Sequence, residues 1–302
     1  MPQHPASTNI EHHLASYLAQ DIQFQAWQPV SGGAIHQAWH VQSRCGQHFF
    51  IKTNQNHKYH TFQAEAHGLT TLTQHLDQEN PLRIPKVFTH GKDTQYSWLI
   101  LEYIPFSQNT PTSQAALGKG LAILHQHHNQ QFGLATNNVI GESVQCNVWT
   151  DDWQFFWTTY RLGYQFKLAA QHGFYNSIQD EAEQLLDVLP QRLDNHHPAP
   201  SLLHGDLWRG NAACDTQGKP IMFDPAVYYG DRECDVAMTE LFGGFSADFY
   251  AAYNDVYPLD DGYQQRKSLY NLYHILNHAN LFAGGYIVQS KHMMQQLIRQ
   301  VT

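Results

Sequence analysis

Short runs of apolar residues dominate the first third of the chain, from Phe24 to Tyr103. Runs of this length, bounded by polar and turn-forming residues, are typical of strands. One longer segment, residues 60–76, repeats its apolar residues at helical spacing and ends before Asn80 and Pro81. The pattern therefore predicts three strands, a helix and two more strands. The first strand follows Phe24, and the other four cover residues 35–41, 48–52, 86–89 and 98–103.

Beyond residue 104 the periodicity becomes helical, first around residues 115–125 and then in three longer amphipathic stretches. These stretches cover residues 151–172, 176–193 and 262–283. Two short apolar runs, 201–203 and 221–223, interrupt them and frame a compact polar segment. We predict an α+β fold with two lobes. Residues 1–103 form a lobe with an antiparallel sheet and an N-terminal helix, and residues 104–302 form a larger, mostly helical lobe.

The charge balance excludes some classes of function. Lys and Arg number 17 against 26 Asp and Glu, giving a net charge of -9. Such a chain offers no basic field for non-specific binding of nucleic acid or anionic membrane. The N-terminal residues show no basic segment followed by an apolar run, and no stretch approaches the roughly 20 apolar residues of a membrane helix. We expect a soluble, cytoplasmic protein without a nucleic-acid or membrane partner.

The spacing of the histidines and cysteines does not favour a structural metal site or a disulfide framework. The 21 histidines are scattered, and their adjacent pairs lack a cysteine or carboxylate at a ligand spacing. A surface role is favoured over metal binding, which stays open. The four cysteines contain no CxxC pair, as expected for free thiols in a reducing compartment. The cysteines are Cys45, Cys146, Cys214 and Cys234.

The polar segment carries the sharpest chemical signal. Asp206 is followed five residues later by Asn211, and Asp224 comes after an intervening strand. Kinase catalytic loops place a base, an asparagine and a metal-binding aspartate in this order. The carboxylate of the base orients the attacking hydroxyl and accepts its proton, while the other two groups hold Mg²⁺ against the phosphates. The alternative is a chance His-Gly-Asp tripeptide and an Asp that caps a turn before Pro225.

Two upstream residues strengthen the kinase interpretation. Lys52 ends an apolar run, as does the lysine that pairs with nucleotide phosphates in kinases. Glu65, on the following helix, is placed to orient that lysine through an ion pair. Separately, Lys52 fits an edge strand and Glu65 a solvated helix position. In order with the aspartates, they predict nucleotide binding.

Two further segments are weaker candidates for nucleotide contact. Gly32 and Gly33 lie between two predicted strands, where kinases cover the nucleotide with a glycine-rich loop, but two glycines also form ordinary hairpins. Glu102, Tyr103 and Ile104 lie where the lobes join, and their backbone groups are candidates for the adenine edge. An ordinary linker is equally compatible with these three residues.

The motifs together resemble the fructosamine kinases and related proteins, the ketosamine-3-kinase family. This family shares a two-lobed protein-kinase-like fold with aminoglycoside phosphotransferases and choline kinases. The resemblance covers nearly the whole chain, and the segment HGDLWxGN followed by DPAxxYG is specific to the family. It includes Gly32 and Gly33 through Trp39, Lys52, Glu65, and residues 147–153, 204–211, 224–226, 229–233 and 241–245. The HRD and DFG motifs of protein kinases are absent, so a protein hydroxyl is not expected as the acceptor.

The resemblance implies that Mg-ATP phosphorylates the sugar 3-hydroxyl of a ketosamine, an early glycation adduct, whose product then decomposes and frees the amine. It implies that Asp206 is the base, Asn211 and Asp224 bind Mg²⁺, and Lys52 with Glu65 contacts the phosphates. Asp235 resembles the acid that braces the catalytic loop through backbone hydrogen bonds. A first-turn aspartate favoured by the helix dipole is the alternative for that residue.

Several aromatic and polar residues are candidates for substrate contact. Trp208 lies between the base and the Mg²⁺ ligand, where we interpret its ring as a stacking surface for the sugar or its amine, with core packing as the alternative. His204, Trp149 and Arg161 are further candidates. Trp149 and Arg161 belong to a helical segment placed to close over the substrate, although aromatic residues at helical spacing are more often core.

One position departs from the family pattern. Members often carry a cysteine just after the two glycines, proposed as a redox switch in disulfide-linked dimers, and here that residue is Ala34. We therefore expect a monomer whose activity is insensitive to thiol oxidation at this loop. The preferred ketosamine, and whether it is free or protein-bound, is left open. Kinases of aminoglycosides, choline or sugars, and a catalytically silent nucleotide-binding protein, remain the alternatives.

Overall fold

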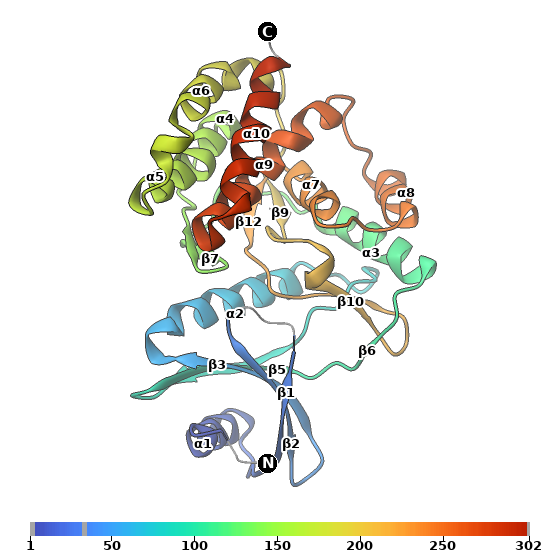
Figure 1. Cartoon of the computed structure of the whole chain (residues 1–302). Coiled ribbons are helices and arrows are strands. Elements are labelled where there is room, and N and C mark those ends of the chain that lie inside the picture. The colour runs from blue at the N-terminus through green and yellow to red at the C-terminus, as the bar shows by residue number, and fades with distance from the viewer. Residues whose placement is uncertain (1–3, 32–34, 301–302) are drawn as a thin grey trace.

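The computed structural model describes residues 4–31 and 35–300, with a sheet at one end and a group of helices at the other (Figure 1). The longer strands are β1 (Phe24–Val30), β2 (Gln37–Ser43), β3 (His48–Gln55), β4 (Val87–Lys92) and β5 (Tyr96–Glu102). The shorter strands are β6 (Phe106–Ser107), β7 (Asn138–Ile140), β8 (Ser143–Gln145), β9 (Ser201–Leu203), β10 (Ala212–Asp215), β11 (Pro220–Met222) and β12 (Tyr228–Gly230).

The helices lie mainly in the second part of the chain. They are α1 (Ser7–Leu18), α2 (Tyr59–Gln74), α3 (Pro111–Leu124), α4 (Trp153–Phe156), α5 (Tyr164–Gln171), α6 (Gln179–Leu193), α7 (Glu233–Leu241), α8 (Ala247–Val256), α9 (Tyr263–Phe282) and α10 (Gly285–Arg299). Short 3-10 turns are η1 (Asn56–Lys58), η3 (Tyr175–Ser177) and η4 (Arg209–Asn211), and η2 (Trp157–Gly163) is a π-helical segment that joins α4 to α5.

The five longer strands form one antiparallel sheet in the order β1-β2-β3-β5-β4. Successive side chains of a strand point to opposite faces, so each face has its own partner. Phe49 and Ile51 of β3 pack in a core with α1, whereas Phe50 packs with the core that includes α2. Lys52 therefore points to the α2 face. That face looks toward the helical lobe, as Figure 1 shows.

The helical lobe is built around α9, whose residues Leu269 to Asn277 are all buried. Helices α7 and α10 pack against it, and the two short antiparallel pairs β9–β12 and β10–β11 lie between these helices and the large sheet (Figure 1). The polar segment between β9 and β10 is therefore held at the junction of the two lobes.

The α+β expectation and the predicted strands and helix of residues 24–103 are confirmed, since each overlaps an observed element. Helices α8 and α10 have no counterpart among the individual predictions, and α7 was expected only as the helix that carries Asp235 in its first turn. Periodicity gives no bounds for α7 because residues Glu233 to Thr239 are all buried, so the segment has no polar face to create a helical period. The stretch 151–172 is helical as expected but contains the π-helical turn η2.

An arginine links the two lobes near the point where the chain passes from one to the other. Arg83 pairs with Glu102 at the end of β5 at 2.6 Å and with Asp215 at the end of β10 at 2.7 Å. Its segment also forms a parallel bridge with Ile221 of β11. One side chain thus ties the sheet to the strands that carry the polar segment.

Two further expectations concern membrane helices and disulfides. Among residues 4–31 and 35–300, no helix is long and apolar enough to cross a membrane. All four cysteines are free thiols. Positions 32–34, which hold the two glycines and Ala34, lie outside the described residues.

The close approach of α3 to α8 generates a first prediction. A Cβ added at Gly118 would lie 2.1 Å from the backbone oxygen of Phe249. Helix propensity alone favours alanine over glycine by about 1 kcal/mol. The clash should nevertheless make Gly118→Ala destabilising by about 1–3 kcal/mol, because the two backbones must separate. Urea unfolding measures this difference.

The matched control is Gly285→Ala in α10, where an added Cβ has nothing within 4 Å. This variant should be neutral or slightly stabilising. Equal stability of the Gly118→Ala and wild-type proteins would contradict the close packing of α3 on α8.

Candidate active site

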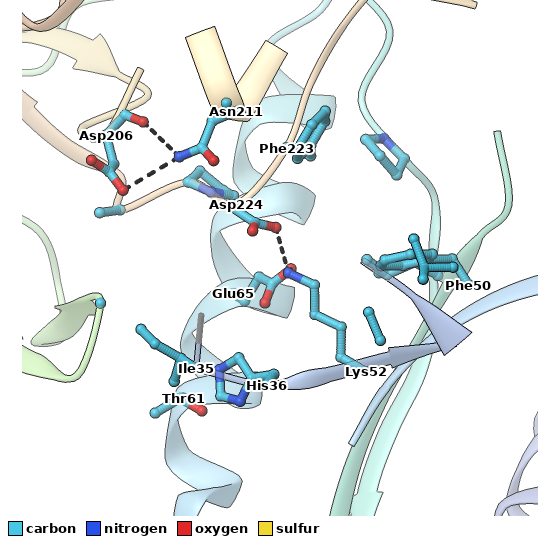
Figure 2. Close-up of a pocket in the computed structure, with 18 of the residues that line it drawn as sticks. Ile35, His36, Phe50, Lys52, Thr61, Glu65, Asp206, Asn211, Phe223 and Asp224 are labelled. Carbon is cyan, nitrogen blue, oxygen red and sulfur yellow. Dashed lines mark hydrogen bonds and ion pairs between the residues drawn. The ribbon is translucent and has the colours of Figure 1, made fainter. Parts of the chain in front are cut away.

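A cavity of about 750 Å³ lies where the large sheet faces the helical lobe. Figure 2 shows that its polar residues come from distant parts of the chain: β3, α2 and the segments around β9 to β11. These residues are Lys52, Glu65, Asp206, Asn211 and Asp224. The cavity thus unites the residues that the sequence motifs single out as a set.

Lys52 is the electrostatic centre of the cavity. Its Nζ lies 2.8 Å from Oε1 of Glu65 and also contacts Oδ1 of Asp224 (Figure 2). Burial alone would lower the pKa of the ammonium, but the two carboxylates outweigh it and hold that pKa above its usual value. Burial raises the pKa of Glu65, and Lys52 opposes this effect. Lys52 is therefore a fixed positive charge between the lobes.

The loop that carries Asp206 is shaped by Asp235. The Asp235 carboxylate accepts backbone hydrogen bonds from His204 at 2.6 Å and Gly205 at 2.8 Å, and His125 contacts it at 3.1 Å. Burial would raise the pKa of Asp235, but these partners hold it below its usual value. Both residues after β9 are thus tied to α7 by one ionised side chain.

Gly205 is required by this loop for two reasons. Its φ of +83° is in the left-handed region, and an added Cβ would lie 2.0 Å from the backbone oxygen of Ala226. A side chain at this position would be strained and would also push the chain away from Asp224. The conformation of the loop therefore depends on glycine before the aspartate.

Asp206 follows at the cavity wall. Asn211 donates through Nδ2 to the backbone oxygen of Asp206 at 2.8 Å and to its Oδ2 at 3.3 Å (Figure 2). Burial, together with the charges of Asp224 and Asp235, raises the pKa of the Asp206 carboxyl to about 7. A carboxylate with a raised pKa is a better proton acceptor than an ordinary one.

Asn211 and Asp224 provide a donor set that fits a magnesium ion. Asn211 uses its amide nitrogen toward Asp206, which leaves the amide oxygen for another partner. Asp224 uses one carboxylate oxygen toward Lys52, and burial is outweighed by that ammonium, so the pKa of Asp224 stays below its usual value. An ionised carboxylate and an amide oxygen are hard ligands that Mg²⁺ prefers. The φ of Asp224 is +56°, a strained value of the kind found at functional sites.

Part of the cavity lining is apolar, and these apolar walls were not predicted from the sequence. They include Val30, Ala38, Phe50, Leu101, Ile140 and Phe223. A signal existed for Phe50, which precedes Lys52 by two residues on the same strand and therefore shares its face. The others are brought together by the sheet, by the hairpin around β7 and β8, and by the segment that follows β11.

The predicted adenine-contact segment lies beside these walls. Glu102, Tyr103 and Ile104 all line the cavity. The Glu102 carboxylate is occupied by Arg83 at 2.6 Å, and the Tyr103 ring stacks on His40 with 3.7 Å between centroids. Any contact of this segment with a ligand in the cavity would therefore come chiefly from its backbone. Gly32 and Gly33 lie outside the described residues.

Trp208 lies at the mouth of the cavity, with 38% of its surface exposed. An added Cβ at Gly210 would lie 2.3 Å from its ring, so the ring rests against this glycine. On its other side the ring contacts Phe242 edge-on, with 6.0 Å between centroids. The aromatic contacts continue outward from Phe242 to His278 at 5.0 Å and from His278 to Tyr286 at 5.0 Å. An aromatic surface thus leads away from Asp206.

Three of the four candidates for substrate contact do not line the cavity. Arg161 is fully buried: its guanidinium donates to the Cys146 backbone and to Asn147, and stacks 4.0 Å from the Tyr228 ring centroid. It is a core cation rather than a lid residue, because these acceptors and the ring enclose the guanidinium inside the lobe. The expectation for Arg161 was therefore wrong.

His204 and Trp149 also lie elsewhere. His204 is buried beneath the loop, where Nε2 contacts the backbone oxygen of Phe223 at 3.0 Å. Trp149 packs against Tyr229, with 6.2 Å between ring centroids, and is absent from the cavity lining. These residues support the surroundings of the site, so their predicted substrate contact is not found.

His196, which has no metal-ligand partner nearby in the sequence, lies next to acidic residues in the fold. His196, Asp231 and Glu233 place ligand-capable atoms within 4.8 Å of one another. Protein partners already occupy these groups, since His196 contacts Asp231 at 2.6 Å and Arg266 donates to both oxygens of Glu233 at 2.7 Å. This arrangement is a buried ion-pair network that braces the segment before α7.

The chain is similar to known proteins over nearly its whole length. The family model described as fructosamine kinase matches residues 6–300. A probable ketoamine kinase of Synechocystis sp. is 43% identical over 291 residues, which are 96% of each chain. A solved structure of a putative fructosamine-3-kinase from Haemophilus somnus has a TM-score of 0.86 and 29% identity, covering 95% of this chain and 96% of that one.

A more distant structure shows the wider fold class. A thermostable mutant of an aminoglycoside phosphotransferase, in a ternary complex with ADP and hygromycin B, has a TM-score of 0.64 and 16% identity. It covers 96% of this chain and 98% of that chain, so the two-lobed kinase-like fold is confirmed. With a family match that spans almost every residue, the chain belongs to the fructosamine kinase family and is a phosphotransferase that acts on a hydroxyl group.

Proposed function

We propose that this protein is an ATP-dependent ketosamine kinase that phosphorylates the 3-hydroxyl of the sugar moiety and so promotes release of the amine. One observation carries the proposal. Lys52, Glu65, Asp206, Asn211 and Asp224 line a single cavity in a chain of the fructosamine kinase family. The cytoplasmic location and the monomeric state expected from the sequence stay predictions.

The lining of the cavity supports one orientation of ATP. The apolar walls suit a flat base, and Glu102 to Ile104, which also line the cavity, offer backbone groups to its edge. The triphosphate then points toward Lys52, whose ammonium is held by Glu65 and Asp224. An ammonium that keeps its charge in a buried site binds phosphate as a fixed point charge. The ADP in the aminoglycoside phosphotransferase complex supports a nucleotide in a fold of this class.

Asn211 and Asp224 are the residues that would hold Mg²⁺. When bound, the ion neutralises negative charge on the phosphate oxygens. The protein keeps both ligands in place by different means. Asn211 is fixed by its two bonds to Asp206, and Asp224 is fixed by Lys52 and by its own backbone conformation.

Asp206 is placed to act on the sugar. Its carboxylate accepts the proton of the 3-hydroxyl as that oxygen forms a bond to the γ-phosphorus. The bond between the γ-phosphorus and the β,γ-bridging oxygen breaks, and ADP leaves with the electron pair. Asp235 and Asn211 hold the loop and the side chain of Asp206, so the carboxylate needs little rearrangement during the step.

The aromatic surface suits the amine end of a ketosamine. A secondary amine is protonated near neutral pH, and the face of an aromatic ring attracts such a cation. Trp208 begins this surface two residues after Asp206, so a sugar at the base would place its amine substituent along the rings. The surrounding stretch, residues 268–290, contains no charged Asp, Glu, Lys or Arg, so no lysine or arginine from it repels the amine.

A kinase for another alcohol is the main rival within this fold. The family match weighs against aminoglycosides and choline, and retention of Lys52, Asp206, Asn211 and Asp224 weighs against a silent nucleotide-binding protein. The deciding experiment measures ADP release with Mg-ATP and a panel of ribulose-lysine, fructose-lysine, kanamycin and choline. Turnover on the sugar amines supports the proposal, and turnover on kanamycin or choline alone would refute it.

Asp206→Asn should lower ketosamine turnover by about a hundredfold or more, because the proton acceptor is lost. ATP affinity should change little, since Lys52 and the apolar walls remain. Steady-state kinetics and calorimetry with ATP measure the two effects. Asp187→Asn, at an exposed aspartate of α6, is the matched control and should behave as wild type. Wild-type turnover of Asp206→Asn would rule out the assigned base.

Asp224→Asn should lower turnover by about 10²–10³-fold and raise the Mg²⁺ concentration needed for half-maximal rate. The amide keeps an oxygen for Lys52 but loses the charge that favours the metal. EDTA should abolish turnover of the wild-type enzyme, and added Mg²⁺ should restore it. An unchanged Mg²⁺ dependence in the variant would remove Asp224 from the metal site.

Trp208→Ala should raise the KM for the ketosamine by about twofold to tenfold through loss of ring stacking. The KM for ATP should stay the same, because the ring is not one of the apolar walls that we assign to the base. Phe155→Ala is the control: this aromatic residue is 48% exposed but does not line the cavity. Equal KM values for the ketosamine in the Trp208→Ala and wild-type proteins would contradict the stacking role.

A further inference from the structure

A buried histidine beneath the catalytic loop has an unused hydrogen-bonding atom. His274 lies on α9, is only 4% exposed, and its Nδ1 has no hydrogen-bond partner among the described residues. The charged atom that faces it is Oδ1 of Asp206, at 4.0 Å. Neither motif analysis nor the proposed transfer step uses this residue.

The atom opposite Nδ1, Oδ1 of Asp206, also lacks a hydrogen-bond donor among the described residues. Asn211 bonds to Oδ2 and to the backbone oxygen of Asp206, and in the described residues no donor lies within hydrogen-bond distance of Oδ1. An unpaired donor and an unpaired acceptor therefore face one another across a gap of 4.0 Å. Nδ1 is also shielded from bulk solvent, so the protein offers it no other partner in this arrangement. Leaving such groups unpaired is costly in a protein interior.

The imidazole is set up as a neutral donor. Burial lowers the pKa of His274 to about 3, and the neighbouring His278 adds to the effect, so the ring carries one proton. A carboxylate opposite Nδ1 favours the tautomer with that proton on Nδ1, since two lone pairs would repel. His278 also bonds through Nδ1 to the backbone oxygen of His274 at 2.8 Å, one turn along the same helix. The ring thus sits on a rigid, buried element.

We propose that His274 is a positioning residue that donates Nδ1–H to Oδ1 of Asp206 when the site is loaded. A movement of roughly 1 Å converts the observed separation into a hydrogen bond. Catalytic hydrogen bonds of empty sites are often long and shorten only with substrate bound. Asp206 is then held from both sides, by Asn211 on Oδ2 and by His274 on Oδ1. Each carboxylate oxygen retains a lone pair for the hydroxyl proton.

This inference rests on the proposed role of Asp206, and it makes the effect of His274 distinct from that of a core residue. His274→Phe removes the donor and keeps an aromatic ring. Its kcat should fall by about tenfold to a hundredfold, because a base misplaced by about 1 Å loses that much rate. The KM values for ATP and ketosamine should not change. Thermal stability should be unchanged or higher, since an unpaired polar atom has been removed.

Two further variants make the comparison specific. His274→Asn restores an N–H donor near the position of Nδ1 and should recover part of the lost kcat. Asn271→Leu removes another buried, unpaired polar atom from α9, and it should leave kcat unchanged. In an Asp206→Asn background, His274→Phe should cause no further loss, because His274 acts only through the base. Wild-type kcat in His274→Phe, or an equal loss in both backgrounds, would overturn the proposal.

A spectroscopic measurement separates this proposal from the substrate assignment. In protein labelled with ¹⁵N-histidine, the Nδ1 resonance of His274 is identified by its absence in His274→Phe. It should shift toward a stronger hydrogen bond when Mg²⁺ and a non-hydrolysable ATP analogue are added with a ketosamine, and not in Asp206→Asn. Failure of ketosamine turnover would reject the substrate. A resonance that stays unchanged in the loaded, active enzyme would reject the positioning role.

Discussion

The site depends on one buried positive charge. Lys52 lies on the face of β3 that looks toward α2, and its ammonium binds a carboxylate of that helix and a carboxylate of the helical lobe. Burial of an unpaired ammonium is costly, so the two carboxylates stabilise Lys52 only where sheet, helix and lobe are all in position. The same contact that joins the three parts also fixes the charge at the centre of the cavity. The phosphate role that we propose for Lys52 therefore depends on the packing of sheet, helix and lobe.

Much of this arrangement was accessible from the sequence, for a physical reason. Asp206, Asn211 and Asp224 are close along the chain, and a loop with a following hairpin constrains their spacing. Lys52 and Glu65 lie on adjacent elements, so their order carries information as well. Arg161 shows where prediction from the sequence failed. A cation in an amphipathic stretch suggests an exposed residue, but Tyr228 and Tyr273, far away in sequence, enclose it. His274 shows the same limit, since only the packing of α9 brings it to Asp206.

Besides Lys52, an arginine joins the two lobes. Arg83 joins the ends of β5 and β10, and its segment forms a bridge with β11. Strands β5 and β11 lead directly into cavity residues: β5 into Tyr103 and Ile104, and β11 into Phe223 and Asp224. An ion pair at this point helps to hold these cavity residues in position. Of the three ion-pair residues, Glu102 also lines the cavity, whereas Arg83 and Asp215 are not among its lining residues.

Three carboxylates lie in or beside the loop after β9, and their partners explain why only one of the three has a raised pKa. Asp224 is held ionised by Lys52, and Asp235 by His125 and two backbone amides. In the described part of the chain Asp206 has no lysine or arginine partner, and it has both other charges nearby. The repulsion adds to burial, so the pKa of Asp206 rises to about 7 while the pKa values of its neighbours fall. A neutral His274 positions this carboxylate without supplying a charge that would cancel the effect, which an arginine in its place would do.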